Sequence, residues 1–495
     1  MGEFAEPNPS ALIESLRAFG YDLKTSVADL IDNSISAGAE NIHIEFSWDG
    51  ENSVISIFDD GRGMTKTDLI NGMRPGSFSP LDLRDKNDLG RFGLGLKTAS
   101  FSQCRKLTVV SKPPGGRTEA RCWDLDHVVS VNKWQLLIPD SYYRPEMSPD
   151  LTDYNSGTLI IWENTDRITK GMNTESRRDM DNFHKMIDGV CEHLSMTFHR
   201  YMEGPGRLHI FVNRTEIEPW DPFLSKHPAT QDITDENWPV MDEIIRIDPY
   251  ILPHHSKMDS DEHACAAGPR GWNAQQGFYV YRNKRLLVPG SWLNLGFKKE
   301  EHYKLARILI DIPNTLDSEW QIDIKKAVAR PPPAIKEDLN RIAKHARSRA
   351  SEIYRHRGKV VSHNTSADFV QMWERISKHG SFFFRINRNH PLVSELLSGD
   401  NGSEPDKIKA LISIIEETVP VQLIALTNSG NPDSFSSPFE YSDEKEIENN
   451  IRILFEVLIT GGDEPVKASE KIKLMDGFSG KSELIEKVLD DICDN

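Results

Sequence analysis

The segment VADLIDNSISAGA, residues 27–39, has the hydrophobic period of an amphipathic helix. Its apolar residues recur every four positions, so they share one face that can pack into a core. This face consists of Val27, Ile31 and Ile35. Asp29, Asn33 and Ser36 share another face, and Asp32 lies beside Asn33. Because Asp and Asn are mediocre helix formers, their place in mid-helix points to a ligand, with a solvated face as the alternative.

Short alternating runs after this helix predict strands. The predicted strands are residues 41–46, 53–58, 106–111, 157–162 and 208–213. Pro9 after Asn8 predicts an earlier helix start, and helical patterning returns over residues 176–202. Residues 61–95 form a long, Gly-rich and polar segment, which is typical of a lid or a binding loop.

A second unit with strand-like runs spans about residues 277–330 and ends at three prolines, residues 331–333. A long basic helix is predicted from residue 334 to about 356. The Pro- and Trp-rich passage near Trp220 marks the first boundary. We therefore expect three regions, residues 1–225, 226–345 and 346–495.

The composition fits a globular protein with an ample core, since 38% of the 495 residues are hydrophobic and 27% are charged. The sequence has no run of 18 apolar residues and no visible signal peptide, so we expect a cytoplasmic protein without a membrane span. The net charge of −17 argues against a protein that coats nucleic acid. Residues 336–359, however, carry a local charge of +5, which fits either a DNA-contacting patch or a solvated helix face.

The five cysteines are widely scattered, which predicts reduced thiols rather than a disulfide framework. The nearest approach to a metal cluster is formed by His254, His255, His263 and Cys265. The surrounding PHHSKMDSDEHACAAG has the character of an exposed loop, so we do not expect a metal centre there.

Three further motifs are candidates for chemistry. In IFDDGRGM, residues 57–64, an apolar run ends at Asp59, and Gly61 and Gly63 allow the backbone to turn close to a ligand; a simple turn is the alternative. In DLGRFGLGLKTAS, residues 88–100, glycines precede a predicted helix start, where backbone N–H groups and Lys97 suit phosphates. It is not a Walker loop. In NSGTLIIWE, residues 155–163, a Gly-Thr pair opens a strand.

The four motifs, in this order, resemble the GHKL ATPases: gyrase, the heat-shock chaperone, histidine kinases and MutL. The resemblance implies an α+β protein, with a GHKL (Bergerat) α/β sandwich, a second α/β transducer-like domain and a mixed, mostly helical C-terminal region. It implies that Asn33 holds Mg²⁺, that Asp59 accepts the adenine amino group, and that Thr158 hydrogen-bonds nearby. The remaining nucleotide contacts that it implies are Gly61, Gly63, Met64, Gly90, Phe92, Gly93, Leu94, Gly95, Leu96, Lys97 and Thr98.

The chain departs from this family at one position. GHKL ATPases usually carry Glu, the residue that activates the attacking water, where this chain has Asp29. Asp is one methylene shorter, and a misplacement of about 1 Å can cost roughly 10²-fold in rate. ATP binding is therefore better supported than fast turnover.

The segment WQIDIKKAVARPP, residues 320–332, resembles the MutL-type segment that sends a lysine into the ATP site. Its register favours Lys325, with Lys326 second; a surface lysine is the alternative. YRNKRLL, residues 281–287, resembles the corresponding strand of MutL and MORC proteins. Residues 1 to about 345 together resemble bacterial MORC/MutL-like ATPases, some of which are encoded beside defence or restriction genes; residues beyond that resemble no family that we recognise.

These resemblances predict an ATP-binding and ATP-hydrolysing protein that uses Mg²⁺ and dimerises when ATP binds. It would act as a clamp, possibly on DNA, with partner proteins from a defence operon. A heat-shock-type chaperone and a non-hydrolysing ATP-sensing scaffold are the alternatives. A kinase is disfavoured, because no phosphoacceptor helix precedes the first motif.

Overall fold

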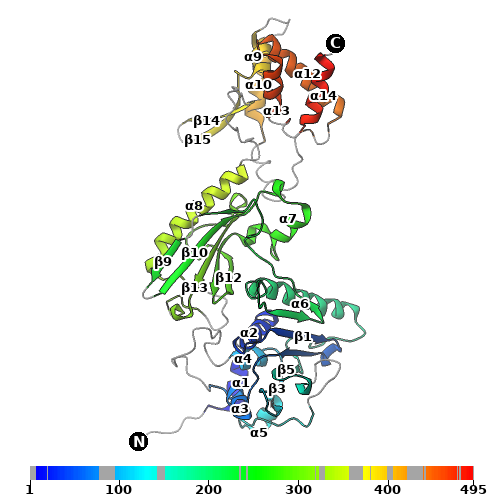
Figure 1. The fold of residues 1–495 in the computed structure, drawn as a ribbon, viewed down its shortest axis with the longest axis vertical. Helices are drawn as coiled ribbons and strands as arrows, with labels where there is room; N and C mark the ends of the chain where they lie inside the picture. Colours follow the sequence, from blue (N-terminus) through cyan, green and yellow to red (C-terminus); the bar gives the residue numbers. More distant parts are fainter. Residues whose placement is uncertain are drawn as a thin grey trace. The chain divides into compact units, whose positions relative to one another are not determined.

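The computed structural model describes most of the chain and divides it into two compact units, Met1–Ser351 and Glu352–Asn495 (Figure 1). The described residues are 7–18, 20–76, 95–141, 151–233, 236–240, 243–317, 319–322, 329–355, 372–378, 381–398, 405–420, 439, 442–475, 478 and 481–493.

The first unit opens with a seven-stranded sheet in the order β4-β3-β5-β2-β1-β6-β7. Its strands are β1 (Asn41–Ser47), β2 (Val54–Asp59), β3 (Lys106–Lys112), β4 (Glu119–Asp124), β5 (Gly157–Glu163), β6 (His209–Val212) and β7 (Thr215–Glu216). Strand β1 pairs in parallel with β6 and antiparallel with β2, and β2 pairs antiparallel with β5.

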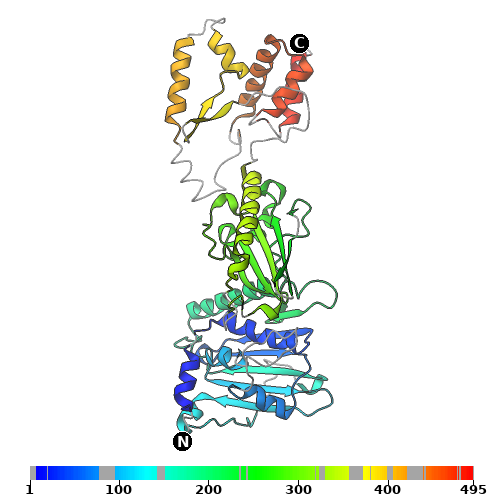
Figure 2. The ribbon, with the colours of Figure 1, turned by 90° about the vertical axis from the view of Figure 1, so that its left-hand side faces the viewer.

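Helices cover one face of this sheet, as Figures 1 and 2 show. They are α1 (Pro9–Arg17), α2 (Leu23–Ser36), α3 (Lys66–Met73), α4 (Gly95–Phe101), α5 (Leu125–Val131) and α6 (Arg177–Thr197). Alternate residues of β1, namely Ile42, Ile44 and Phe46, pack with Val27 and Ile31 of α2 in the main core. Phe58 and Val110 belong to a smaller cluster, so residues of β2 are buried on both faces.

The predicted strands of this region are confirmed to within a residue or two. The helices at Pro9, around residues 27–39 and over residues 176–202 are also present, but α2 begins and ends three to four residues earlier than predicted, and α6 ends five residues earlier. Strand β4, which pairs with β3, was not predicted. Its sequence, EARCWD, is poor in β-branched residues. Pairing and burial, rather than propensity, decide its conformation.

The second sheet of this unit has the order β12-β11-β13-β10-β8, with β9 paired to β10. Its strands are β8 (Gln231–Asp232), β9 (Glu236–Val240), β10 (Glu243–Ile251), β11 (Gly277–Arg282), β12 (Arg285–Ser291) and β13 (Ala306–Ile312). The last three were predicted from the sequence. The first three were not, because charged residues and prolines interrupt their pattern; Arg246 and Asp248, for instance, pair with each other on β10.

Helix α8 (Lys336–Arg355) confirms the predicted basic helix and runs along one face of the second sheet (Figures 1 and 2). It buries an apolar stripe of Leu339, Ile342, Ala343, Ala346 and Ala350.

The prediction of an exposed loop around His263 is wrong, because Ser260–Ala267 form helix α7. Its start is fixed by a capping box, in which the side chains and backbone N–H groups of Asp259 and Glu262 bond reciprocally. This signal is present in the sequence as Asp259 followed three residues later by Glu262.

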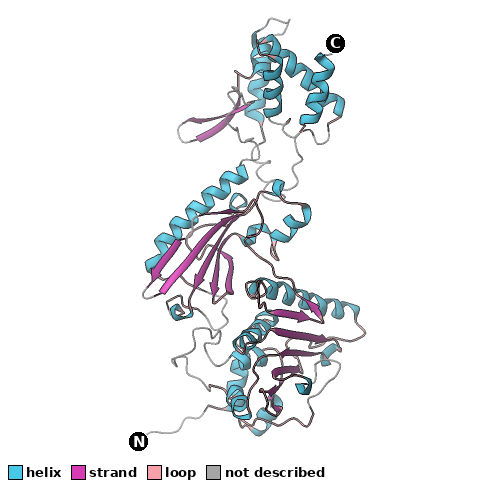
Figure 3. Ribbon diagram, in the orientation of Figure 1, coloured by secondary structure: helices cyan, strands magenta, loops and turns pink. Residues whose placement is uncertain are grey.

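The second unit is mostly helical, with one hairpin (Figure 3). The hairpin consists of β14 (Trp373–Lys378) and β15 (Ser381–Ile386). The helices are α9 (Pro391–Ser398), α10 (Pro405–Thr418), α12 (Glu444–Thr460), α13 (Pro465–Leu474) and α14 (Ser482–Cys493). Ile451, Ile472 and Ile485 place α12, α13 and α14 around one core. Among the described helices of the whole chain, none is both long enough and apolar enough to cross a membrane.

Candidate functional site

Helix α2 carries polar side chains into the interior of the first unit. Asp22 caps its start by accepting a hydrogen bond from the Thr25 N–H (2.9 Å). Asp29, Asp32 and Ser34 are all buried, whereas Asn33 is exposed. The predicted polar face is therefore split: its first carboxylate is enclosed, and its amide stays accessible.

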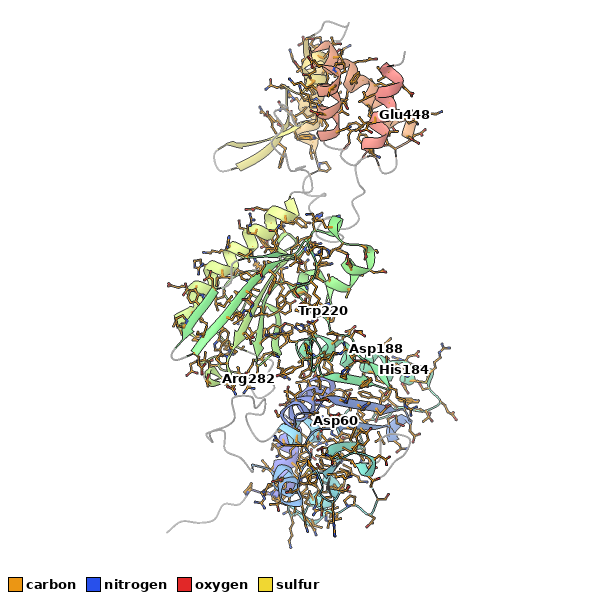
Figure 4. The ribbon with its side chains drawn as sticks, in the orientation of Figure 1. Asp60, His184, Asp188, Trp220, Arg282 and Glu448 are labelled. Atoms are coloured by element: carbon orange, nitrogen blue, oxygen red, sulfur yellow. The ribbon has the colours of Figure 1, made fainter. Side chains whose placement is uncertain are left out.

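Asp59 lies at the end of β2 and is buried (Figure 4 labels its neighbour Asp60). Its Oδ2 accepts a hydrogen bond from the Ser34 hydroxyl (2.9 Å), and its Oδ1 accepts one from the Gly61 N–H (3.1 Å). Burial raises the pKa of the Asp59 carboxyl to about 6, although both hydrogen bonds oppose that rise. The carboxylate is thus held in place by α2 and by the turn after β2.

Thr158 stands directly opposite Asp59 in the pairing of β2 with β5. Its hydroxyl lies 2.9 Å from the Ser111 hydroxyl of β3, and Ser111 accepts a hydrogen bond from the Met64 N–H (2.8 Å). The structure therefore brings together three residues expected at the adenine end, namely Asp59, Thr158 and Met64. Sequence reasoning missed Ser34 and Ser111; a serine inside the buried, apolar run of β3 is the signal that could have indicated Ser111.

Glycines let the backbone turn tightly after this carboxylate. Gly63 has φ +61°, and a Cβ there would overlap the Lys112 carbonyl. A Cβ at Gly61 would stand 2.9 Å from both Ala37 Cβ and Asp59 Oδ1. The backbone therefore passes close to Asp59 at Gly61, and close to Lys112 at Gly63, only because these positions are glycine.

The predicted phosphate-binding segment is only partly described. Gly90, Phe92, Gly93 and Leu94 lie outside the described residues, as does Lys325. Gly95 opens α4, followed by the half-buried Leu96 and the buried Lys97 and Thr98.

Lys97 bonds within the protein rather than pointing into solvent. Its ammonium donates a hydrogen bond to the Gly72 carbonyl (2.8 Å), which ties α4 to α3. Burial lowers the pKa of this ammonium to about 8. An anion placed beside it would favour the charged form.

Asp29 and Asp32 face a residue that the sequence did not indicate. Arg285, the first residue of β12, donates from Nε to Asp32 Oδ1 (2.7 Å), and its Nη2 lies 3.6 Å from Asp29 Oδ1. The second sheet therefore contributes a buried cation to the carboxylates of α2.

The side chains fit an adenine nucleotide. A carboxylate can accept about four hydrogen bonds, and Ser34 and Gly61 supply one to each oxygen, so Asp59 retains capacity for the amino group of a base. The hydroxyl of Thr158 and the glycine backbone adjoin it. For Mg²⁺, the accessible amide of Asn33 offers an oxygen of the kind that hard cations prefer.

The histidines around α7 pack against neighbouring rings. The rings of His254 and His255 lie 4.0 Å apart, and His263 stacks on Trp272 at 4.9 Å. Within the described part of the chain, no group of three His, Cys, Asp or Glu side chains could hold a metal ion.

Comparison with known families agrees with this geometry. Residues 21–158 match the family described as histidine kinase-, DNA gyrase B-, and HSP90-like ATPase. The N-terminal part of this chain therefore carries an ATPase domain of the GHKL class, on an α+β fold.

Within that class, MORC and MutL proteins are relatives over this part. The chain is 30% identical over 91 residues to ATPase morc-1 of Caenorhabditis elegans, covering 18% of this chain and 10% of that protein. It is 41% identical over 90 residues to DNA mismatch repair protein MutL of Dictyoglomus turgidum, covering 17% and 15%. Chaperone protein HtpG of Clostridium acetobutylicum is 34% identical over 103 residues, covering 19% and 16%. The chain thus spans less than a fifth of each of these relatives.

Proposed function

We propose that this protein binds ATP with Mg²⁺ at the site around Asp59 and hydrolyses it to ADP and phosphate. The observation that carries the proposal is the buried Asp59 carboxylate, oriented by Ser34 and Gly61, with Thr158 opposite it in the adjacent strand. A buried carboxylate is costly to maintain, so its retention beside a glycine turn argues for a ligand that bonds it.

The assigned roles follow the two ends of the site. Asp59 accepts the amino group of adenine, and Thr158 hydrogen-bonds nearby. Asn33 would hold the Mg²⁺, which would offset the negative charge of the phosphates, and Lys97 with Gly95 and the preceding glycines would contact the phosphates. Lys325, which lies outside the described residues, is the proposed second catalytic residue, on the resemblance of its segment to that of MutL.

Asp29 is the proposed general base. It takes a proton from water as the water oxygen attacks the γ-phosphorus, and the bond to the β–γ bridging oxygen breaks to release ADP. The side chain is shorter than the usual Glu, and Arg285 stands beside it. These two features also favour a second candidate, an ATP sensor that binds nucleotide without releasing phosphate.

Titration calorimetry with a non-hydrolysable ATP analogue tests the binding site. Asp59→Ala should abolish detectable heat, because the base would face a buried site without an acceptor. Asp49→Ala, at an exposed acid in the connection between β1 and β2, is the control and should bind as the parent does. Equal binding by the parent and Asp59→Ala would overturn the assignment.

The proposed output is an ATP-gated dimer of the MORC/MutL type. Light scattering should show a higher mass with the analogue and Mg²⁺ than with ADP. A mass that stays constant across nucleotides and protein concentrations would contradict the proposed ATP-dependent dimer.

DNA is the proposed substrate of this clamp, with α8 as the contact. Its four candidate cations are Arg341, Lys344, Arg347 and Arg349. Arg341 bonds both oxygens of Glu236, and Arg347 lies 3.6 Å from the centre of the Tyr303 ring. Lys344 and Arg349 are both exposed, so DNA phosphates could reach them. Lys344→Glu with Arg349→Glu should reduce salt-sensitive DNA retention; unaltered retention would mark a solvated face.

The similarity to HtpG supports a chaperone as a competing function. Unfolded client proteins would then stimulate phosphate release, and DNA would leave it unchanged. A role in a cytoplasmic defence system, with partner proteins, is the biological setting that we propose for the DNA clamp.

A further inference from the structure

Arg285 connects the second sheet to the carboxylates of α2, although 253 residues separate it from Asp32. The side chain of Arg285 is 3% exposed, as is that of Asp29, and Asp32 is fully buried. Charges enclosed in this way attract more strongly than charges at a surface, and breaking a buried pair is expensive. The buried ion pairs of Arg285 with Asp29 and Asp32 are therefore part of the connection between α2 and the second sheet.

The hairpin of β11 and β12 fixes where this guanidinium stands. Arg282 and Arg285 pair across the hairpin end, and Asn283 and Lys284 between them have φ of +48° and +66°. Positive φ at both turn residues is the mark of a tight type I′ turn, which leaves little freedom in the first residue of β12.

The C-terminal end of α6 and the residues after it hold the hairpin in place. The His199 ring bonds the Tyr281 hydroxyl (2.7 Å), Arg200 pairs with Asp311 of β13 (2.8 Å), and the Tyr201 hydroxyl donates to the Asn283 carbonyl. Met196 packs in one apolar cluster with Tyr279, Tyr281 and Leu286. Arg285 therefore approaches α2 from a rigid support. Figure 4 labels Arg282 at this end of the hairpin.

The guanidinium divides its donors between two carboxylates. Its Nε makes a short, charge-assisted bond to Asp32, and its Nη2 lies at ion-pair distance from Asp29. Burial and the charge of Arg285 lower the pKa of the nearby His193 to about 4, so this ring is neutral at physiological pH. The two carboxylates thus share one planar fork, which a lysine could not reproduce.

We propose that Arg285 is a positioning residue for ATP turnover: anchored on Asp32, it holds the Asp29 carboxylate in place from the second sheet. The inference rests on the proposed hydrolysis. In this proposal the second sheet influences hydrolysis at the first sheet through Arg285. The Arg285 side chain itself touches neither phosphate nor water in the proposed reaction.

Arg285→Lys tests the proposal, because it keeps the charge and removes the fork. Single-turnover phosphate release should fall by about tenfold or more, while the Kd for a non-hydrolysable ATP analogue stays within about threefold. The conservative change keeps a cation beside the buried carboxylates, and thermal unfolding reports whether the variant is folded. Asp32→Asn is the second variant, and it should slow release with unchanged affinity, since Asn keeps an acceptor for Nε but loses the charge that anchors it.

Arg282→Lys is the matched control. Arg282 is equally buried, ends the partner strand of the same hairpin, and bonds Asp317 from Nε at 2.8 Å, away from α2. It should lower stability about as much as Arg285→Lys and leave phosphate release of the folded protein unchanged.

Four results would overturn the positioning role, and the last of them would overturn the proposed hydrolysis as well. Equal losses of release in Arg285→Lys and Arg282→Lys would mean that the joint only supports the fold. Parent-like release in Arg285→Lys would mean that Asp29 does not depend on Arg285, and faster release would mean that Arg285 restrains it. A parent that binds the analogue but releases no phosphate would instead sink the proposed hydrolysis, and the positioning role with it.

Discussion

The two ends of the candidate site are built in different ways. At the adenine end, Ser34 comes from α2, and Asp59 and Thr158 come from adjacent strands of the first sheet. Asp59 accepts its hydrogen bonds from α2 and from the turn after its own strand. At the other end, Asp29 and Asp32 form ion pairs with Arg285, which belongs to the second sheet. One carboxylate is enclosed by neutral donors, whereas the other two share a cation.

This difference separates binding from chemistry. Burial raises the pKa of Asp59, and its two neutral donors do not fully oppose that rise. A ligand that donates a hydrogen bond to the carboxylate can offset the remaining cost of the buried charge. A guanidinium fixes the carboxylates of α2 in position and makes their geometry depend on how the two sheets are joined. Binding should therefore belong to the first sheet alone, and turnover to the pair of sheets.

Asp29→Ala gives the largest expected effect at the catalytic end. A general base contributes roughly 10²–10⁴-fold to rate, so phosphate release should fall by that factor while analogue affinity stays within a few-fold. Asp29→Glu restores the usual reach and should raise the rate. A phosphate-release assay beside calorimetry checks both variants, and undiminished release in Asp29→Ala would show that α2 supplies no base.

Asp59→Asn gives the largest expected effect at the adenine end. It should lower the affinity for the analogue and raise the free energy of unfolding. Analogue affinity should fall about tenfold or more, because the amide replaces one acceptor by a donor. The free energy of unfolding at pH 8 should rise by about 2–3 kcal/mol, since Asn carries no buried charge. Denaturant melts at pH 8 and pH 4 check this, with Asp49→Asn as the exposed control; a loss of stability at pH 8 would contradict the assigned pKa.

The pH dependence of the parent follows from the same shift. The pKa of Asp59 rises from 3.8 to about 6 on folding, so the folded chain holds this proton more tightly. The contribution of this group to stability is therefore fully present below pH ~4 and is lost as the pH rises through about 6.

Analogue affinity should change in the opposite sense, falling about tenfold between pH 7.5 and pH 5 as the acceptor is protonated. Calorimetry at the two pH values measures it, and residual binding by Asp59→Asn should be flat over the same range. If the affinity of the parent for the analogue were the same at both pH values, Asp59 would not be the acceptor whose protonation controls binding.

Ser34→Ala should give the smallest effect. It removes one hydrogen bond to Asp59, worth about 1 kcal/mol, so affinity should fall by about three- to tenfold. Ser15→Ala is the matched control, because Ser15 and Ser34 both bond the carbonyl four residues earlier in a helix, and only Ser34 reaches Asp59. An equal response of the two variants would mean that the hydroxyl of Ser34 does not orient the carboxylate.

The sequence by itself determined the local elements and part of the site. The period of Val27, Ile31 and Ile35 indicated α2, and alternation indicated β1, because these spacings repeat with the geometry of the backbone. The order of four motifs indicated Asp59 and Thr158 together, and the pairing of β2 with β5 sets them opposite each other. Where the pattern was broken by charges or prolines, as in β10, or where a capping signal was overlooked, as at α7, the prediction was missing or wrong.

Only the tertiary structure decided which polar groups meet. No spacing indicates that Ser111 of β3 would link Met64, in the turn after β2, to Thr158 of β5, since these residues come from distant segments of the chain. None indicates that Arg285, in a hairpin of the second sheet, would meet Asp29 and Asp32. Period and propensity act over a few residues of backbone, whereas these contacts depend on how the two sheets are joined, and the burial of Met196 of α6 against Tyr281 and Leu286 of the second sheet contributes to that joint.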